Sequence, residues 1–142
     1  MNSKIEIFIE KLDIKANKKG PIIPKLDSFY TKLVNNLKFK FNAETVNGLV
    51  EQLKCLSQLN KKTEHKDIFY YFICDLLFKI IKKIKFKYLF NIWQDVLSTV
   101  IETMYSRSFN CCLSAILLIE HILISNLILL KKLKKFVNNF KI

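Results

Sequence analysis

Glycine and proline are almost absent from this 142-residue chain, which has two of each. Three of the four cluster at Gly20, Pro21 and Pro24, so that only Gly48 remains elsewhere. β-Sheets need frequent turns, and turns depend on glycine, proline, asparagine and aspartate. From residue 25 onward the turn signals have the spacing of helical hairpins, whereas an all-β domain would show them roughly every 8–12 residues. This scarcity predicts an all-α fold.

Sequence motifs of catalysis are also missing. The chain has no glycine-rich dinucleotide fingerprint, no phosphate-binding loop, no HExxH and no GxSxG. Its two histidines, His65 and His121, lie far apart and have no cysteine at ligand spacing, so no metal site is expected. Glu120 adjoins His121, but neighbours on a helix point in different directions. We therefore expect a protein that is not an enzyme and that uses no cofactor.

The four cysteines form no CxxC pair; they are Cys55, Cys74, Cys111 and Cys112. The stretch from Met1 to Lys11 lacks the long apolar core of a secretory signal. Reduced and mostly buried thiols are therefore expected, in a cytoplasmic protein of a reducing compartment.

Acidic residues are few, and arginine is nearly missing. The chain has 24 basic residues against 12 acidic ones, a net charge of +12, and Arg107 is its one arginine. Such a balance is typical of proteins that meet a polyanion: nucleic acid, an acidic protein surface or anionic lipid. The alternative is compositional drift in an AT-rich genome. Drift explains lysine in place of arginine better than it explains the excess of lysine over acids.

Lysines without nearby acids form two groups, one between Leu76 and Gln94 and one after Glu120. The predicted polyanion-binding residues are Lys79, Lys82, Lys83, Lys85, Lys87, Lys131, Lys132, Lys134 and Lys135. If both groups lie on one outer surface, they form a field that steers anionic partners. Lysine acts as a point charge, so recognition of phosphate or shape with strong salt dependence is expected. The alternative is a solvated face that only keeps the protein soluble.

Apolar residues recur at helical spacing along most of the chain. The predicted helices span about residues 3–12, 28–40, 42–59, 64–85, 88–105, 109–124 and 127–139. Residues 13–26 hold both prolines and are predicted to be an extended basic arm. The chain is thus divided into an N-terminal segment, 1–26, and a single helical domain, 27–142. We expect six or seven helices stacked as antiparallel hairpins, in a HEAT-like array or a compact bundle.

Polar residues at the predicted helix starts indicate N-caps: Asp27 or Ser28, Asn42 and Thr63. Near the first lysine group, three aromatic residues are candidates for stacking on bases: Phe86, Tyr88 and Phe90. They follow the apolar stripe of their predicted helix, so a place in the core is expected instead.

One apolar run, residues 113–130, is followed by lysines, a pattern typical of a membrane span with its basic end inside. Glu120, His121, Ser125 and Asn126 lie near its centre, and an acidic side chain there costs about 2.5–3.5 kcal/mol on insertion. The favoured interpretation is a core helix of a soluble protein. A small membrane protein that spans with residues 113–130 is the alternative.

Three segments in order carry a resemblance to a known family. Thr45–Gly48 opens a helix, Trp93–Met104 leads into a turn at Ser106 and Arg107, and Cys111–Leu123 is a long aliphatic helix. Over about residues 43–123 this order resembles the C-terminal domain of the regulatory subunit of katanin, the microtubule-severing complex. The proline that the family places within the second segment is absent here.

The resemblance implies an adaptor. One helical surface would bind the N-terminal domain of the catalytic ATPase, and basic residues would touch the acidic microtubule lattice. The leading interpretation is therefore a non-enzymatic helical interaction module, with an apolar groove for a partner helix and a lysine-rich face for an acidic surface. The alternative is a basic helical protein bound to RNA in a ribonucleoprotein such as a ribosome.

Overall fold

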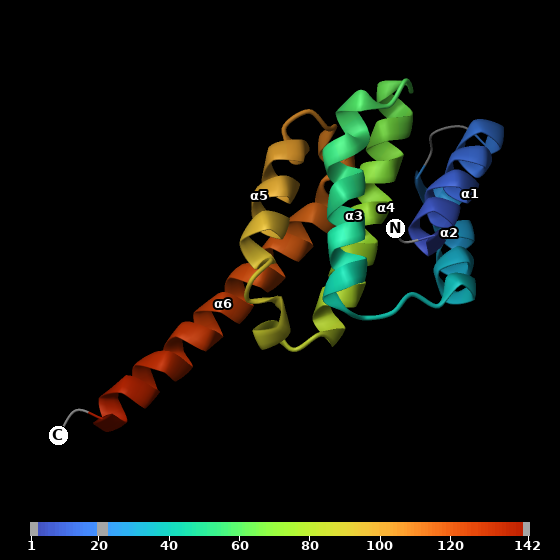
Figure 1. Cartoon of the computed structure of the whole chain (residues 1–142). Helices are drawn as coiled ribbons and strands as arrows, with labels where there is room; N and C mark the ends of the chain where they lie inside the picture. Colours follow the sequence, from blue (N-terminus) through green and yellow to red (C-terminus); the bar gives the residue numbers. More distant parts are fainter. Residues whose placement is uncertain (1–2, 20–22, 141–142) are drawn as a thin grey trace.

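Six α-helices make up most of the computed structural model, which describes residues 3–19 and 23–140 (Figure 1). They are α1 (Ser3–Lys19), α2 (Ile23–Leu37), α3 (Ala43–Cys55), α4 (Thr63–Lys83), α5 (Trp93–Met104) and α6 (Leu113–Phe140). Three short 3₁₀ turns lie between them: η1 (Leu56–Gln58), η2 (Phe86–Leu89) and η3 (Phe109–Cys111). The described residues include no strand, so the predicted all-α fold of six or seven helices is confirmed.

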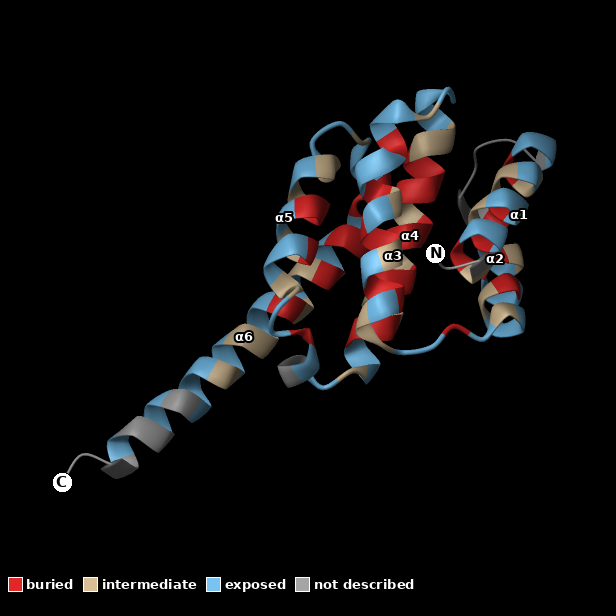
Figure 2. Cartoon of the chain, viewed as in Figure 1, coloured by how far each residue is buried: buried red, intermediate tan, exposed pale blue. Residues whose placement is uncertain are grey.

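The helices pair as antiparallel hairpins, α1 with α2, α3 with α4 and α5 with α6 (Figure 1). The second and third hairpins stack so that α3 lies against α5 and α4 lies against α6. The first hairpin packs on the other side of α4, which α1 contacts directly. Helix α4 is therefore central, and it is buried over most of its circumference, as its apolar and aromatic composition predicts (Figure 2).

The N-terminal region differs from the prediction. Residues 13–26 are not an extended arm, because α1 continues to Lys19 and α2 already begins at Ile23; residues 20–22 lie outside the described part. Ala16 is fully buried and extends the apolar stripe of α1 beyond Leu12. Pro24 stands in the first turn of α2, where a helix does not need its missing N–H. The expected boundary between residues 26 and 27 therefore falls inside a helix.

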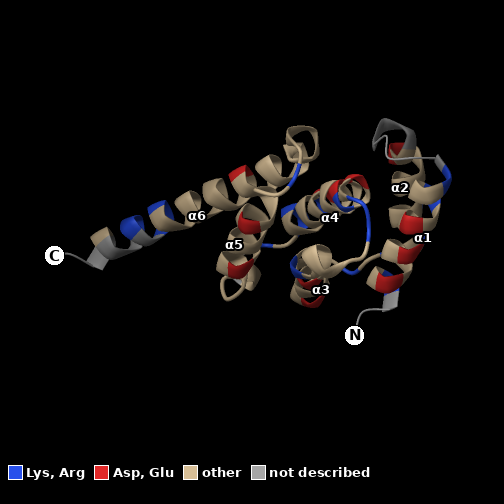
Figure 3. Ribbon diagram, turned by 90° about the horizontal axis from the view of Figure 1, so that it is seen from above, with Lys and Arg blue, Asp and Glu red and all other residues tan. Residues whose placement is uncertain are grey.

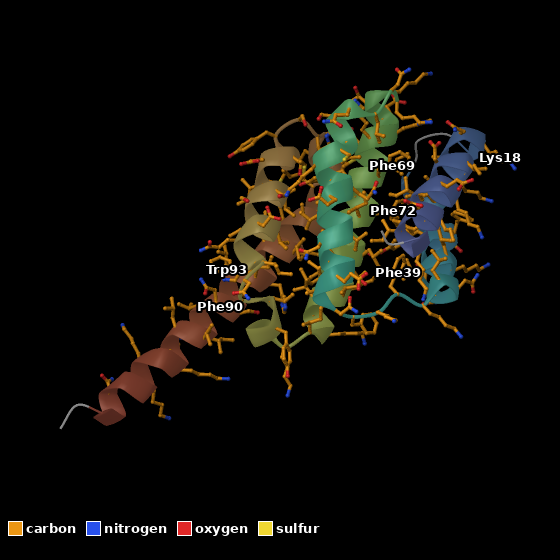
Figure 4. The ribbon with its side chains drawn as sticks, viewed as in Figure 1. Lys18, Phe39, Phe69, Phe72, Phe90 and Trp93 are labelled. Atoms are coloured by element: carbon orange, nitrogen blue, oxygen red, sulfur yellow. The ribbon has the colours of Figure 1, made fainter. Side chains whose placement is uncertain are left out.

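Aromatic side chains join the first hairpin to the rest of the core. The rings of Tyr30 and Phe72 stack with centroids 4.4 Å apart, and Phe8 meets Tyr30 edge to face at 6.0 Å. The Tyr30 hydroxyl donates a hydrogen bond of 2.6 Å to Asp75 on α4. Figure 4 shows Phe72 and Phe69 between α4 and the first hairpin. One continuous hydrophobic core thus runs from α1 to the first turns of α6.

Among the predicted caps, Asn42 is confirmed: its Oδ1 accepts a hydrogen bond of 3.0 Å from the backbone N–H of Thr45. Thr63 is not a cap but the first residue of α4, and Lys62 before it caps without a side-chain bond. Asp27 and Ser28 lie inside α2 and cap nothing. Polar side chains such as these also occur within helices, which is why cap predictions from sequence fail.

Helix ends also differ in the second half of the chain. The segment predicted as one helix from 88 to 105 is the turn η2 followed by α5. The two helices predicted at 109–124 and 127–139 are one helix, α6. Ser125 and Asn126 do not interrupt it, because neither removes a backbone donor as proline would.

Candidate interaction surface on the last helix

Helix α6 extends well beyond the helices on which it packs (Figure 1). Its 28 residues make it about 42 Å long, at a rise of about 1.5 Å per residue. Among its described side chains the buried ones lie in its first ten positions and face α4 and α5; they are Ser114, Ala115, Leu118 and Ile122. Ser114 fixes this packing by donating a hydrogen bond of 2.8 Å to the carbonyl oxygen of Tyr71. The remainder of the helix projects away from the body.

The side of α6 that faces away from α4 and α5 is aliphatic and exposed (Figure 2). We call this surface the outer face of α6; it consists of Leu113, Ile116, Leu117, Leu123, Ile124, Leu127, Ile128 and Leu130. Each of these side chains is between 40% and 58% exposed. Glu120 lies within this face and is exposed too. A contiguous aliphatic surface of this kind marks an interaction site in a folded protein.

The expectation that residues 113–130 form a core helix holds for part of the stretch: Ala115, Leu118 and Ile122 belong to the core, whereas the outer face is exposed. The stretch Leu113–Lys132 has a mean hydropathy of 2.2, yet only 22% of its apolar 18-residue window is buried. By length and composition it is the one described helix that could cross a membrane. The body covers a single stripe of α6 and ends near Ile122, so most of the described aliphatic side chains of the helix stay about half exposed. A complete crossing would require the first three turns to leave α4 and α5.

The first lysine group lies at the C-terminal end of α4 and is partly neutralised. Lys79 forms an ion pair of 2.9 Å with Asp75, and its Nζ lies 4.7 Å from the centroid of the Tyr30 ring. Lys82 lies 4.4 Å from the ring centroid of Phe78. Their neighbours Lys83 and Lys85 are exposed, Lys83 against Phe41, and the side chain of Lys87 lies outside the described part. The sites on α4 thus remain predictions, with Lys79 the least available for a partner.

The second lysine group consists of Lys131, Lys132, Lys134 and Lys135, all exposed near the projecting end of α6. No ion pair involves them within the part of the chain that the structure describes. Lys82 of the first group lies beside His121, and Lys131 follows His121 by ten residues, or about 15 Å along the helix. The two lysine groups are therefore separate on the surface, although the first lies beside α6 and the second lies on it (Figure 3).

His121 sits where α6 leaves the body and contacts the ring of Phe78, with centroids 5.9 Å apart. Burial, together with the positive charge of Lys82, lowers the pKa of His121 below its usual value. The imidazole is therefore neutral at pH 7 and adds nothing to the positive surface. Within the described residues no group of histidine, cysteine and carboxylate side chains could hold a metal ion.

Two aromatic residues of the segment after α4 are exposed and not in the core as expected. Tyr88 is 65% exposed and Phe90 is 58% exposed; the side chain of Phe86 lies outside the described part. The segment forms a 3₁₀ turn instead of an α-helix, and within η2 Leu89 is the described side chain that turns inward. In the view of Figure 4, Phe90 and Trp93 lie at the end of the body from which α6 projects.

The cysteines are mostly buried, as predicted. Cys74, Cys111 and Cys112 are buried, whereas Cys55 is exposed, and all four are free thiols. Burial raises the pKa of the Cys74, Cys111 and Cys112 thiols. A thiol with a raised pKa is a poor nucleophile, so these side chains act as small apolar core residues.

Sequence reasoning missed one buried ion pair, between Arg107 and Asp67. Beside it lies a cavity of about 50 Å³. The cavity is lined by Leu53, Lys54, Leu56, Ser57, Thr103, Ser106 and Arg107. Lys54 at its edge is paired with Glu51 and Asp95, so each cation of the cavity already has an acidic partner. The signal in the sequence was the single arginine among many lysines, because arginine suits buried ion pairs better.

Comparison with known proteins gives no match. No family model fits the sequence, and no curated protein and no solved structure is significantly similar to it.

Proposed function

We propose that this chain is a non-catalytic helical interaction module that docks partners through the outer face of α6. The observation that carries the proposal is the exposure of eight aliphatic side chains on that one face, while α3, α4 and α5 bury theirs within the stack. Water-exposed aliphatic surface on this scale is unfavourable by roughly 25 cal/mol for each Å² that a partner would cover. The docking surface in this proposal is thus a helix face, where a groove between hairpins was expected.

The most concrete version of the proposal is a katanin-like regulatory module. The segments that resemble the katanin regulatory subunit coincide with elements of the fold: α3 begins at Ala43, and α5 spans Trp93–Met104. The turn at Ser106 and Arg107 then leads through η3 to α6. In this version the partner is the helical N-terminal domain of the catalytic ATPase, and catalysis belongs to that partner.

The lysines near the projecting end of α6 have a second role in the proposal. Four exposed ammonium groups within five residues, without carboxylates near them in the sequence, attract an acidic surface. The microtubule lattice is the version that accompanies a katanin-like module, and RNA phosphate is the alternative. A salt series distinguishes binding by charge attraction from binding by shape. Affinity that rests on charge attraction to a polyanion falls steeply between 50 and 200 mM salt, by roughly 10³ or more for six contacts.

The test of docking is a titration of the purified chain with the N-terminal domain of a katanin-type ATPase from the same organism. We expect Leu127→Asp to weaken binding by roughly a hundredfold, because it places a charge in the centre of an apolar interface. Asn47→Asp adds the same charge at an exposed position of α3 and serves as the matched control. If the unaltered chain shows no binding in calorimetry, the katanin-like version is wrong. If both variants bind equally, docking does not use the outer face of α6.

Membrane attachment is a second candidate, which the apolar stretch Leu113–Lys132 favours. Its test is carbonate extraction of membranes from cells that produce the chain. Retention in the membrane pellet would support insertion of α6, and release into the supernatant would contradict it.

A further inference from the structure

We infer that the outer face of α6 binds the same face of a second copy of this chain, with the two helices antiparallel. The inference rests on the proposed function, because it names a partner for the same surface. Three features carry it: the spacing of the aliphatic side chains, the placement of charge along the helix, and the position of the body relative to the outer face.

The spacing along the outer face is that of a coiled-coil seam. One row of positions along this side of α6 alternates at intervals of three and four residues; they are Leu113, Ile116, Glu120, Leu123, Leu127, Leu130 and Lys134. Five of these seven side chains are aliphatic, and the five are 43–58% exposed. A seam of this period packs best against another helix with the same period. A second α6 offers such a helix.

The charges of α6 select the antiparallel orientation. Glu120 is the one acidic residue of the helix, and the lysines lie one to two heptads after it, at 131, 132, 134 and 135. With a twofold axis at Leu127, Glu120 of each copy lies opposite Lys134 of the other, because both are seven residues from the axis. A parallel pair would instead place the α6 lysines of one copy beside the same lysines of the other, and each Glu120 beside its equivalent. Like charges at such positions are repulsive.

The antiparallel arrangement also suits the helix dipoles. The C-terminal end of α6 carries partial negative charge, and the N-terminal end carries partial positive charge. In an antiparallel pair each end lies along the opposite end of the neighbouring helix. With the twofold axis at Leu127, the lysines of each copy then run beside the segment 119–123 of the other.

The body leaves room for this arrangement. Ser114, Ala115, Leu118 and Ile122 face α4 and α5, whereas the outer face points the other way. The projecting half of one copy can therefore lie along the docked half of the other without displacing its body. The contact is isologous, which is the usual form of a symmetric dimer. It covers the aliphatic side chains both on the docked half and on the projecting half of α6.

A lipid bilayer fits the same surface less well. While the first turns of α6 are held by α4 and α5, the aliphatic segment that projects freely is Leu123–Leu130. Eight residues of helix span about 12 Å, against about 30 Å for the hydrocarbon core of a membrane. A bilayer that covered the whole outer face would also receive Glu120 without a counter-charge, whereas a second copy supplies Lys134.

The first experiment measures the mass of the purified full chain by light scattering after size exclusion, at loading concentrations from 1 to roughly 100 µM, a range that brackets typical weak dimers. The expected mass is twice the chain mass of 16.8 kDa. We expect Leu127→Asp to be monomeric, and Glu120→Lys to weaken the dimer by roughly tenfold, the effect of losing a good charge pair. Glu120→Lys combined with Lys134→Glu should restore it. Glu102→Lys makes the same charge change at an exposed position of α5 and is the control.

The second experiment tests the orientation. In a Cys55→Ser background, which removes the one exposed thiol, the variants Glu120→Cys and Lys134→Cys are mixed and oxidised. Antiparallel pairing yields a mixed disulfide between the two variants. Disulfides formed mainly within each variant would indicate parallel pairing and overturn the inference.

The outcomes separate this inference from the proposed function. A monomer at the highest concentration, with ATPase-domain binding that depends on Leu127, overturns the dimer and leaves the docking module intact. A monomer that floats with vesicles containing phosphatidylserine overturns the dimer in favour of lipid. A monomer that binds neither partner overturns both proposals. Circular dichroism on every variant shows whether a loss of association reflects lost helix.

Discussion

The guanidinium of Arg107 lies 3.4 Å from the carboxylate of Asp67, and the two side chains are only 8% and 11% exposed. Asp67 lies in the second turn of α4, and Arg107 lies in the turn between α5 and η3. The facing atoms, Nη1 and Oδ1, have no hydrogen bond within the described structure. Their mutual attraction, together with the hydrogen bonds that the guanidinium donates to Ser106 Oγ, offsets the removal of both charges from water. The pair therefore attaches the turn after α5, which leads through η3 to α6, to the central helix α4.

Replacing this arginine is expected to destabilise the fold strongly. Arg107→Met leaves the carboxylate of Asp67 buried without a counter-charge, and the expected loss in free energy of unfolding is about 3 kcal/mol. Urea denaturation followed by circular dichroism measures it. Adding Asp67→Asn should recover part of the loss, since the buried charge is then gone. Lys54→Met, which breaks an exposed pair, should have a much smaller effect; equal losses in both variants would contradict the assigned role of Arg107.

The hydrogen bond from Tyr30 to Asp75 gives a second prediction. Burial and the nearby carboxylate of Asp75 raise the pKa of Tyr30, so the phenol keeps its proton and donates. Tyr30→Phe keeps the stacking on Phe72 but removes the donor, and we expect a loss of about 1.5 kcal/mol, as for a hydrogen bond to a charged group. Thermal or urea unfolding measures this loss. Tyr105→Phe removes a hydroxyl from a side chain that is 82% exposed, and it should leave stability unchanged.

Periodicity predicted the helical part of this fold because the pattern is local. The stripe of Phe8 and Leu12 and the cap at Asn42 are properties of neighbouring residues. Pro24 misled the prediction, because proline ends a helix or begins one according to its position, and only the fold decides which. The N-terminal helices were thus underestimated.

The candidate surface could be predicted only in part. The sequence shows that residues 113–130 are aliphatic, but it does not show which neighbours cover them. The answer depends on where α4 and α5 end in space, and that is a tertiary property. The same limit applies to Tyr88 and Phe90, whose exposure follows from a 3₁₀ turn in place of an α-helix. The buried ion pair of Arg107 had a signal in the sequence, because Arg107 is the single arginine among many lysines.

His121 gives the fold a specific dependence on pH. Burial, with a smaller contribution from Lys82, lowers its pKa in the folded state, while the unfolded value is about 6.5. The unfolded chain therefore binds the proton more readily. The contribution of neutral His121 is complete above about pH 6.5 and is lost as the pH falls through the folded pKa.

The measurement is the free energy of unfolding at pH 7.5, 6 and 5 for the unaltered chain and for His121→Gln. Carboxylates titrate in both proteins, so the difference between the two curves isolates His121. We expect the variant to lose less stability than the unaltered chain between pH 7.5 and 5. Parallel curves for the two proteins would refute the prediction.

Lys38 closes α2 with a positive backbone angle, φ 51°, a conformation that is unfavourable for a residue with a Cβ atom. Its N–H donates to the carbonyl oxygen of Val34 at 3.3 Å, as at helix ends that glycine usually terminates. Lys38→Gly is therefore expected to raise the free energy of unfolding by about 0.5 kcal/mol. Lys40→Gly, two residues on in the same loop, should lower it. The idea fails if both substitutions destabilise equally in urea titrations.

The unequal support of α6 has a mechanical consequence. Its first ten residues are held by α4 and α5, and the next eighteen continue as one rigid rod of about 27 Å. A tilt of about 10° at Ile122 would displace Lys135, about 20 Å farther along the helix, by about 3 Å, a movement that needs no change in the rod itself. A small change in the packing of His121 and Phe78 thus becomes a larger displacement at the far end of the helix. Conversely, a partner that binds the far end of the helix changes the packing in the core.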